Sequence, residues 1–600
     1  MIARMKKVTI AARESEMDET LEVIGGLGIL HLAHVREPRS SDIENLRGEI
    51  DLLERALSVL SGGTSDKEGG EVAPRQEPMD LARDVLGLLE QKGHHLEARD
   101  GTRKELKKIG PLGQFDPSDL DLLKDAGLIV RFYRVSRSDM SRFSQHVGYP
   151  YAVVSSRGSE RIVMVIGDQD FDLSFEEVRV TRGLSDLEQE LESLEDKLKE
   201  IDIELQKKRT SISLIKESLE SKREELEYAQ AIAGAGRHGP LSYVQGFCPE
   251  DSCGDLKDTA ARRGWGLLIE DPVPEDDVPT LLRNPKWLRI VEPVFRFMGT
   301  VPGYKEYDVS FWFLVSLSLF FAMLVGDGGY GLLFFLGTYL LKRKRRTAPK
   351  EPFILLYVFS MSTVVWGFIT GTWFGVERLS HVPPLSRLII PALDSYRGDQ
   401  DFMIGLCFVL GAIHLSIAHM LRVRGLFGSL RVLGEVGWIF ILWFLYFLAG
   451  YFVLGNPLPD KSTFLLWAGL ILAGLFSNPG GNFIKSSLLG IADLPFNMIR
   501  SFSDLVSYLR LFAVGYATLV IAVSFNQMAF DLWEGSMLGA FAAALVLLIG
   551  HTLNIMLAAM AVLVHGIRLN MLEFSSHLGM NWIGRPFRPF KRRFGSRVGK

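Results

Sequence analysis

Two arginines lie inside long apolar segments of the sequence. Arg510 lies in DLVSYLRLFAVGYATLVIAV and Arg568 in HTLNIMLAAMAVLVHGIRLNMLEF. A charged side chain within a bilayer costs from about 2.5 to above 10 kcal/mol, so it persists where it faces water or an ion partner. Because a guanidinium stays charged at any relevant pH, it can attract a carboxylate without giving up a proton. The alternative is that the side chain snorkels to the interface, which fits Arg568 better than the deeper Arg510.

The last apolar segment carries a polar stripe. At 100° per residue, five side chains fall within about 140° of one another: His551, Asn554, His565, Arg568 and Glu573. Hydrogen bonding between helices is one explanation of such a stripe. Its position beside two arginines favours a water-accessible ion path. Glu435, in a separate apolar segment, is a further candidate for this path.

Asp327 lies in GDGGYG (326–331), which formally matches the dinucleotide fingerprint G-x-G-x-x-G. No soluble strand precedes the motif, and it lies within an apolar run, so glycines at a helix break explain it better. We keep Asp327 as an ion-path candidate. No G-x-x-x-x-G-K-[ST] occurs in the chain. We therefore expect no nucleotide site and no ATP hydrolysis by this chain itself. Cys248 and Cys253 have no second pair and no nearby His, so we expect no metal centre, and no cofactor is expected.

The elements that position these residues are apolar runs after residue 308. A bilayer-spanning helix needs about 20 residues. The sequence predicts eight transmembrane helices: two in 309–341, broken at GDGGYG, and one each in 353–376, 402–421, 432–454, 463–477, 497–530 and 537–574. The last two are longer than a bilayer requires and are expected to tilt steeply. Loops assigned to the inside (342–350, 422–431, 478–500, 585–600) hold 18 Lys and Arg, against 4 in the outside loops, which predicts that both ends are cytoplasmic.

The first half of the 600-residue chain has a different composition. Residues 1–300 hold 42 Lys and Arg against 56 Asp and Glu, while residues 301–600 hold 25 against 15. The split excludes a single soluble globule, a disordered chain and a nucleic-acid binder driven by bulk positive charge. Strands are predicted at 5–12, 29–35, 128–135, 151–156, 161–167, 241–247 and 266–271, with helices near 14–25 and 250–263.

Heptad patterns separate these strands. Ile43 to Leu60 and Leu184 to Leu226 carry apolar residues spaced alternately by three and four, which is typical of a coiled coil. We predict an antiparallel pair within one chain, broken by a loop-rich linker at 62–78; a homodimeric coil is the alternative. The predicted cytoplasmic arm thus comprises α+β lobes (1–40 with 111–180, and 235–280) joined by a coiled coil (about 41–110 with 181–234), followed by an all-α membrane domain at 301–600.

Several motifs resemble one family over nearly the whole chain. They include SYLRLFA (507–513), HGIRLNMLEF (565–574), GHTLN (550–554), GRPFRPF (584–590), GDGGYGLL (326–333) and YVQGFCPED (243–251). The sequence resembles the membrane-embedded a subunit, called subunit I in prokaryotes, of V-type and archaeal A-type rotary ATPases. The two arginine segments are the most specific part of the resemblance.

The resemblance implies a non-catalytic stator subunit beside a rotor ring of small c/K-type subunits, each with a carboxylate at mid-bilayer. Two offset half-channels would lead H⁺ or Na⁺ to that contact. Arg510 would meet each carboxylate, Arg568 would support it, and ring rotation would be coupled to ATP synthesis or hydrolysis. The arm would bind E/G-type peripheral stalks and a C/d-type central-stalk subunit. The arm is shorter than in eukaryotic members, which favours a prokaryotic, archaeal plasma-membrane enzyme.

Two positions depart from the eukaryotic pattern of that family. Thr518 stands where a histidine is found, and Ala558 where a glutamate is found. Channel-lining roles at these positions are not carried over, and Glu573, His551 and Glu435 remain candidates without an assigned order. A stand-alone secondary transporter with a regulatory arm is the alternative, although the two halves of the membrane part show no convincing repeat. A membrane-anchored scaffold would explain the heptads but leaves Arg510 unexplained.

Overall fold

The computed structural model describes residues 2–61, 77–114, 116–169, 171, 173–346, 348–477, 483–533 and 535–591. The predicted linker 62–78, apart from Glu77 and Pro78, lies outside these residues, as do parts of the inside loops 478–500 and 585–600. The chain divides into two compact units. One comprises Met1–Val8, Phe247–Arg262 and Leu268–Pro589, and the other comprises Thr9–Gly246, Arg263–Leu267 and Phe590–Lys600.

One sheet joins strands from both ends of the first half of the chain. Its order is β2-β8-β1-β9, and β7 pairs with β8; the strands are β1 (Met5–Arg13), β2 (His31–Ala33), β7 (Gly236–His238), β8 (Leu241–Pro249) and β9 (Gly266–Glu270). Helices α1 (Met17–Leu27) and α8 (Cys253–Arg263) belong to the same part of the sequence. Residues 1–40 therefore share a sheet with 235–280, and their predicted grouping with 111–180 is wrong. Periodicity identifies a strand but not its partner, which here is more than 200 residues away.

Residues 117–177 form a sheet of their own. Its order is β4-β5-β3-β6, with β3 (Ile129–Ser136), β4 (Tyr151–Arg157), β5 (Glu160–Gly167) and β6 (Glu176–Glu177), flanked in sequence by α4 (Pro117–Asp125) and α5 (Met140–His146). β3 and β5 are antiparallel, with Ile129 opposite Gly167 and Ser136 opposite Glu160. Inward-facing Tyr133 and Val163 pack with Phe143 of α5 in its core.

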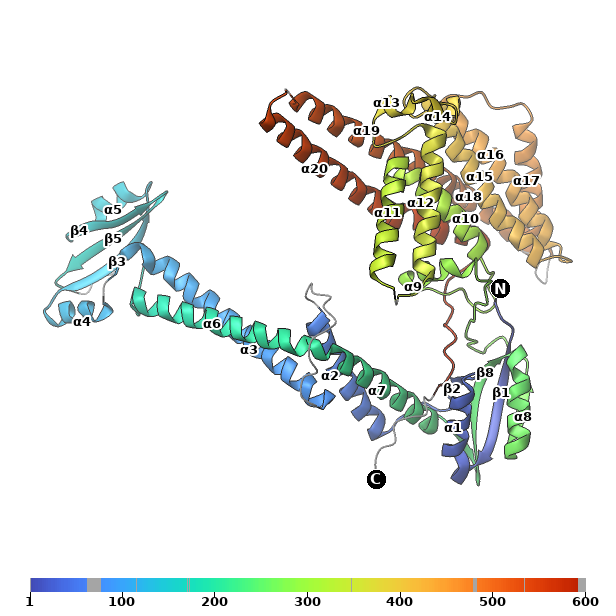
Figure 1. Cartoon of the computed structure of the whole chain (residues 1–600), viewed down its shortest axis with the longest axis horizontal. Helices are drawn as coiled ribbons and strands as arrows, with labels where there is room; N and C mark the ends of the chain where they lie inside the picture. The colour runs from blue at the N-terminus through green and yellow to red at the C-terminus, as the bar shows by residue number, and fades with distance from the viewer. Residues whose placement is uncertain are drawn as a thin grey trace. The chain divides into compact units, whose positions relative to one another are not determined.

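Between the lobes run four long helices: α2 (Ser41–Ser61), α3 (Pro78–Ile109), α6 (Leu184–Lys208) and α7 (Ile212–Ala233). α6 lies beside α3, and α7 beside α2 (Figure 1). Lys92 pairs with Asp202 at 2.6 Å, and Lys208 pairs with Asp84 at 3.0 Å, so residue numbers rise along one helix and fall along the other. The helices are thus antiparallel partners within one chain. Whether they form a coiled coil stays a prediction.

The second half of the chain is helical. Its long helices are α10 (Ser310–Val325), α11 (Gly328–Lys344), α12 (Glu351–Thr370), α15 (Gln400–Gly425), α16 (Arg431–Leu454), α17 (Ser462–Phe476), α18 (Phe483–Val506), α19 (Leu509–Leu532) and α20 (Met537–Ala561). Shorter helices are α9 (Glu292–Met298), α13 (Glu377–Ser380), α14 (Pro383–Ser386) and α21 (Ser575–Leu578). α20 continues into two π-helical segments, η7 (Val562–Gly566) and η8 (Leu569–Phe574).

Five helical segments among the described residues are long and apolar enough to cross a membrane, or six if the bent pair α10 and α11 is one span. That pair bends by 118° at Gly326–Asp327, and α17 has 15 residues, fewer than a full span. The eight predicted spans are therefore not confirmed as spans, although helices occupy each predicted segment. The break at GDGGYG is confirmed.

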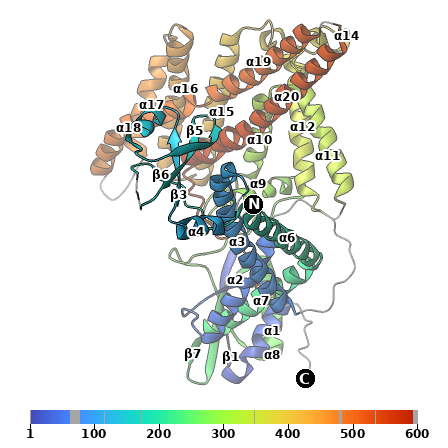
Figure 2. The ribbon, with the colours of Figure 1, turned by 90° about the vertical axis from the view of Figure 1, so that its left-hand side faces the viewer.

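The last two segments are long, as predicted: Ser487–Leu532 has 46 residues and Met537–Leu578 has 42. At 1.5 Å per residue, each exceeds the roughly 30 Å of a hydrocarbon core about twofold. α19 and α20 lie side by side and cross α11 and α12 obliquely (Figures 1 and 2).

The helical arm yields a stability prediction. Leu53 of α2 is fully buried among Leu81, Val85 and Ile215. Leu53→Ala should destabilise the pairing of α2 with α7 by about 2–5 kcal/mol, because the cavity is only partly filled by relaxation. Hydrogen exchange of the intact chain should show faster exchange in α2 and α7. Leu89→Ala, at an exposed position of α3, is the matched control and should leave exchange unchanged; equal exchange in both variants would contradict this packing.

Candidate functional site

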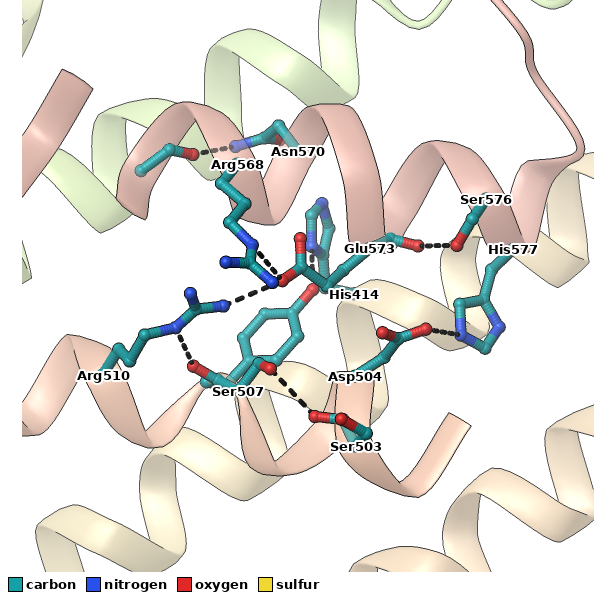
Figure 3. A network of polar contacts seen from close by, with 12 residues as sticks. His414, Ser503, Asp504, Ser507, Arg510, Arg568, Asn570, Glu573, Ser576 and His577 are labelled. Atoms are coloured by element: carbon teal, nitrogen blue, oxygen red, sulfur yellow. Dashed lines mark hydrogen bonds and ion pairs between the residues drawn. The ribbon is translucent and has the colours of Figure 1, made fainter. Parts of the chain in front are cut away.

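Arg510 and Arg568 converge on one buried carboxylate, that of Glu573 (Figure 3). The Arg510 Nη2 donates to Glu573 Oε1 at 2.8 Å, and the Arg568 Nε lies 3.4 Å from the same oxygen. The Glu573 side chain is 2% exposed, against 25% for Arg510 and 52% for Arg568. The sequence named all three residues, and the structure brings them together.

Arg510 is positioned by a break between α18 and α19. In a regular α-helix the Ser507 carbonyl would accept from the amide of Leu511. Here Leu511 donates to the Tyr508 carbonyl instead, and the Ser507 carbonyl accepts from the Arg510 amide at 3.3 Å and from its Nε at 3.0 Å. The tight turn thus supplies an acceptor that fixes the guanidinium with its Nη2 on Glu573.

Arg568 and Glu573 are positioned by a π turn. In an α-helix, residues five apart point about 140° away from each other. The π-helical segment η8 covers Leu569–Phe574, and a π turn brings residues i and i+5 into register. Asn570 supports this geometry because its Nδ2 donates to the Gly566 carbonyl, and its Oδ1 accepts from Ser316 of α10 at 2.5 Å. The wide turn therefore places both side chains on the same face.

The site carries one uncompensated positive charge. Two guanidiniums share one carboxylate, and both bonds fall on Oε1. The buried Oε2 of Glu573 has no hydrogen-bond partner within the described residues. A buried charge that loses its partner costs about 3–5 kcal/mol, so Glu573 holds the arginines firmly while leaving them net positive. An arrangement of this kind can attract a second carboxylate.

His551 and Asn554 belong to a separate cluster around Tyr330 of α11. The Tyr330 hydroxyl lies 2.7 Å from His551 Nδ1 and accepts from Asn554 Nδ2 at 3.0 Å. His551 Nε2 lies 3.1 Å from the Asn526 side-chain oxygen of α19. The predicted stripe is thus divided between two clusters, because Asn554 and Arg568 lie 14 residues apart along the helix, roughly 21 Å at 1.5 Å per residue. His565 joins neither: its buried Nδ1 has no partner in the described part of the chain.

Asp327 is held by backbone amides. It accepts from Gly329 at 2.7 Å, Tyr330 at 3.2 Å, Phe374 at 2.9 Å and Gly375 at 3.0 Å. Phe374 and Gly375 have φ of 52° and 64°, a left-handed pair that turns successive amides toward one anion. The carboxylate caps α11 and fixes the 371–376 loop. This occupation favours a structural role over the ion-path role that the sequence suggested.

Glu435 lies in a third cluster, with His419 and Arg422 of α15. Its Oε2 is 2.7 Å from His419 Nδ1, and its Oε1 is 3.0 Å from Arg422 Nη2. Sequence reasoning overlooked His419, and also His577 and Asp504, which pair at 3.3 Å. Their signal was available, since an ionisable residue within an apolar span is a candidate by default. No group of three or more His, Cys, Asp or Glu side chains suited to a metal ion occurs among the described residues.

Comparisons with known proteins identify the family of the chain. No protein-family model matches the chain. The chain is 30% identical to the V-type ATP synthase subunit I of Borreliella burgdorferi, over 99% of this chain and 100% of that protein. It is 28% identical to V-type ATP synthase subunit I 1 of Treponema pallidum, over 99% and 100%, and 24% identical to the A-type ATP synthase subunit I of Methanocaldococcus jannaschii, over 92% and 85%.

A solved structure of the cytoplasmic N-terminal domain of a V-ATPase subunit I, homolog of subunit a, covers 44% of this chain and 99% of its own, at 13% identity and a TM-score of 0.23. That score is too low to carry an argument about the fold. The long relatives and the apolar helices define a membrane subunit of a rotary ATP synthase. The chain belongs to the subunit I family of V-type ATP synthases. The two most similar of these relatives are bacterial, so the expected archaeal origin is not supported.

The contacts of Asp327 predict a loss of stability rather than a specific loss of transport. Asp327→Ala would leave four amides without their acceptor, at about 1–3 kcal/mol for each one that stays buried. Asp327→Asn keeps one acceptor oxygen and should lose less. The midpoint temperature of thermal unfolding of the purified protein should be highest for the wild type, lower for Asp327→Asn and lowest for Asp327→Ala. The control is Asp531→Ala, at an exposed position, which should leave the midpoint unchanged. An Asp327→Asn protein of unchanged stability that no longer supports transport would instead indicate an ion-path role.

Proposed function

We propose that this chain is the stator membrane subunit of a V/A-type rotary ATPase, in which Arg510 meets the carboxylate of each passing rotor subunit. The observation that carries the proposal is the convergence of Arg510 and Arg568 on Glu573, which leaves one net positive charge on a partly exposed guanidinium. One rotor carboxylate would balance that charge. The chain couples translocation of H⁺ or Na⁺ to ATP synthesis or hydrolysis in partner subunits and has no catalytic site of its own.

The electrostatics follow from the neighbours of the rotor acid. Beside Arg510 the ionised carboxylate is favoured, so the acid releases its ion there. Away from Arg510 the acid faces lipid and must be neutralised by H⁺ or Na⁺ before it can turn. Glu573 keeps the arginine paired between encounters, because a guanidinium left alone at low dielectric is costly. The rotor acid then exchanges with Glu573 rather than meeting an unpaired charge.

Two hollows support two half-channels. One, of about 40 Å³, lies between the loop that carries Asp394 and Asp399 and the α19 residues that follow Arg510; its lining includes Gln400, Leu511, Gly515 and Tyr516. The other, of about 170 Å³, is lined by His419, Arg422, Asn497, Arg500 and His577. The sidedness predicted from the Lys and Arg counts of the loops puts the first hollow on the outer side and the second on the cytoplasmic side. With such an offset, an ion could pass from one hollow to the other only while bound to a rotor carboxylate as the ring rotates.

The exposed face of α20 supports contact with a rotor. Large exposed apolar side chains recur every three or four residues along α20 and into η7 and lead toward Arg568: Phe541, Leu545, Ile549, Leu553, Met556, Met560 and Leu563. Such a stripe on a long helix can follow the curved wall of a c/K-type ring.

The rest of the membrane domain, from about residue 301, would lie in the bilayer of the cell membrane with both termini in the cytoplasm. The arm of residues 1–300 would bind E/G-type peripheral stalks and a C/d-type central-stalk subunit.

Replacement of Arg510 tests this function directly. Arg510→Gln should abolish ATP-driven ion transport by the reconstituted complex while assembly and membrane insertion remain intact, because Glu573 would then balance Arg568 and no net positive charge would remain to ionise the rotor acid. Arg424→Gln, at an exposed position, is the control and should pump normally. Purification through this chain should also bring down a small, very hydrophobic ring protein and ATPase head subunits. Normal pumping by Arg510→Gln would refute the role.

A further inference from the structure

A buried chain of two histidines and two carboxylates lies beside the arginine site. It joins α15, α16, α18 and α21, and its members are His419, Glu435, Asp504 and His577. Glu435 Oε2 is 2.7 Å from His419 Nδ1, His419 Nε2 is 3.0 Å from His577 Nδ1, and His577 Nε2 is 3.3 Å from Asp504 Oδ2. Every nitrogen of both rings is thus used, and the chain is continuous from end to end.

The hydrogen-bonded row of four side chains holds one proton more than two neutral histidines supply. Three hydrogen bonds need three hydrogens, and two neutral imidazoles supply two. The third is an additional proton, which can reside on either carboxylate or on either ring. An imidazole can bind a proton on one nitrogen and release another from its second nitrogen. A proton that enters at one end therefore releases a different proton at the other, and no heavy atom has to travel.

The two histidines of this hydrogen-bonded chain line a hollow, and its Asp504 end lies near the arginine site. His419 and His577 line the 170 Å³ hollow, which the loop charges assign to the cytoplasmic side. Asp504 lies six residues before Arg510, and His577 lies four residues after Glu573. Figure 3 shows Asp504 and His577 next to Ser507 and Glu573. The chain of side chains therefore leads from the hollow toward the site where the rotor acid would be ionised.

The surroundings of this chain disfavour a metal cation. The side chains of Glu435, His419 and His577 are at most 8% exposed, and contacts of 2.7–3.3 Å leave no room for a hydrated ion between them. The charged groups that face the chain from neighbouring positions are Arg422, which pairs with Glu435, and Arg500, which lines the hollow. Arg500 at the mouth repels Na⁺, while Glu435 balances the charge of Arg422. A proton can still pass by exchange along water and imidazole.

We infer that His419, His577 and Asp504, with Glu435 as the far acceptor, relay protons between the cytoplasmic hollow and the rotor acid, and that the ion translocated is H⁺ rather than Na⁺. This inference rests on the proposed function and specifies its ion. In each transfer the N–H or O–H bond of the donor breaks as a new bond forms on the next nitrogen or oxygen, and no other reactant is consumed.

The test uses the complete complex in liposomes, with ATP-driven acidification as the readout. Asp504→Asn and His577→Ala should each slow acidification by at least about tenfold, in the range of a lost proton-transfer group. The exposed His381→Gln is the control and should acidify normally. The wild-type rate should not depend on Na⁺, and a protonophore should abolish the gradient.

Chemical rescue separates a relay from a structural role. In His577→Ala the adjoining hollow can admit a free imidazole, so added imidazole should restore part of the rate. 1-Methylimidazole has a similar ring but no exchangeable N–H, and it should not restore the rate. No rescue by imidazole in an assembled His577→Ala complex, or equal rescue by both compounds, would overturn the relay.

The outcomes distinguish this inference from the proposed function. If Arg510→Gln abolishes transport while Asp504→Asn and His577→Ala acidify at the wild-type rate, the function holds and the relay is refuted. If wild-type transport requires Na⁺ and survives the protonophore, the assignment of H⁺ is refuted. If Arg510→Gln transports normally, the proposed function fails, and the relay that rests on it fails with it.

Discussion

The ion pair between Glu573 and two arginines is the interaction on which the membrane domain depends. A carboxylate that is 2% exposed in an apolar bundle is tolerated only with cationic partners, and both guanidiniums reach the same oxygen. Each arginine needs an irregular stretch of helix to do so. The tight turn at Ser507–Tyr508 directs Arg510, and the π turn of η8 directs Arg568. Both departures from regular helical geometry bring a guanidinium to the same carboxylate oxygen.

Charge balance connects this pair to the polar clusters around it. A site with net positive charge holds an anionic partner, but it can release an ion only if a path leads away from it. The Tyr330 cluster and the chain that ends at Asp504 lie in different parts of the helical domain, and each consists of side chains with mutual hydrogen bonds. Polar groups of this kind are costly in a bilayer unless they are paired. Their number is difficult to explain in a scaffold that only anchors the arm.

Sequence patterns predict which residues are unusual and where helices and strands lie, but they do not predict which distant residues come into contact. Arg510, Arg568 and Glu573 were identified because charge within an apolar run is rare, and strand and helix positions followed from periodicity. The grouping of the lobes was wrong because sheet order depends on contacts between residues more than 200 positions apart. An ion-path role for Asp327 stays a prediction, since the amides that donate to it from Phe374 and Gly375 belong to a loop that no local pattern reveals.

The π turns explain why the meeting of Arg568 and Glu573 on one face could not be predicted from helical spacing. A projection at 100° per residue assumes that every turn is α-helical, and each π turn shifts all later residues around the axis. Two such segments, η7 and η8, lie between Asn554 and the end of the helix. They turn Glu573 toward Arg510 while leaving Asn554 on Tyr330. A regular helix would have kept the stripe on one face but moved Arg568 away from the acid it shares with Arg510, so the irregular geometry is what makes a three-membered charge site possible on two helices.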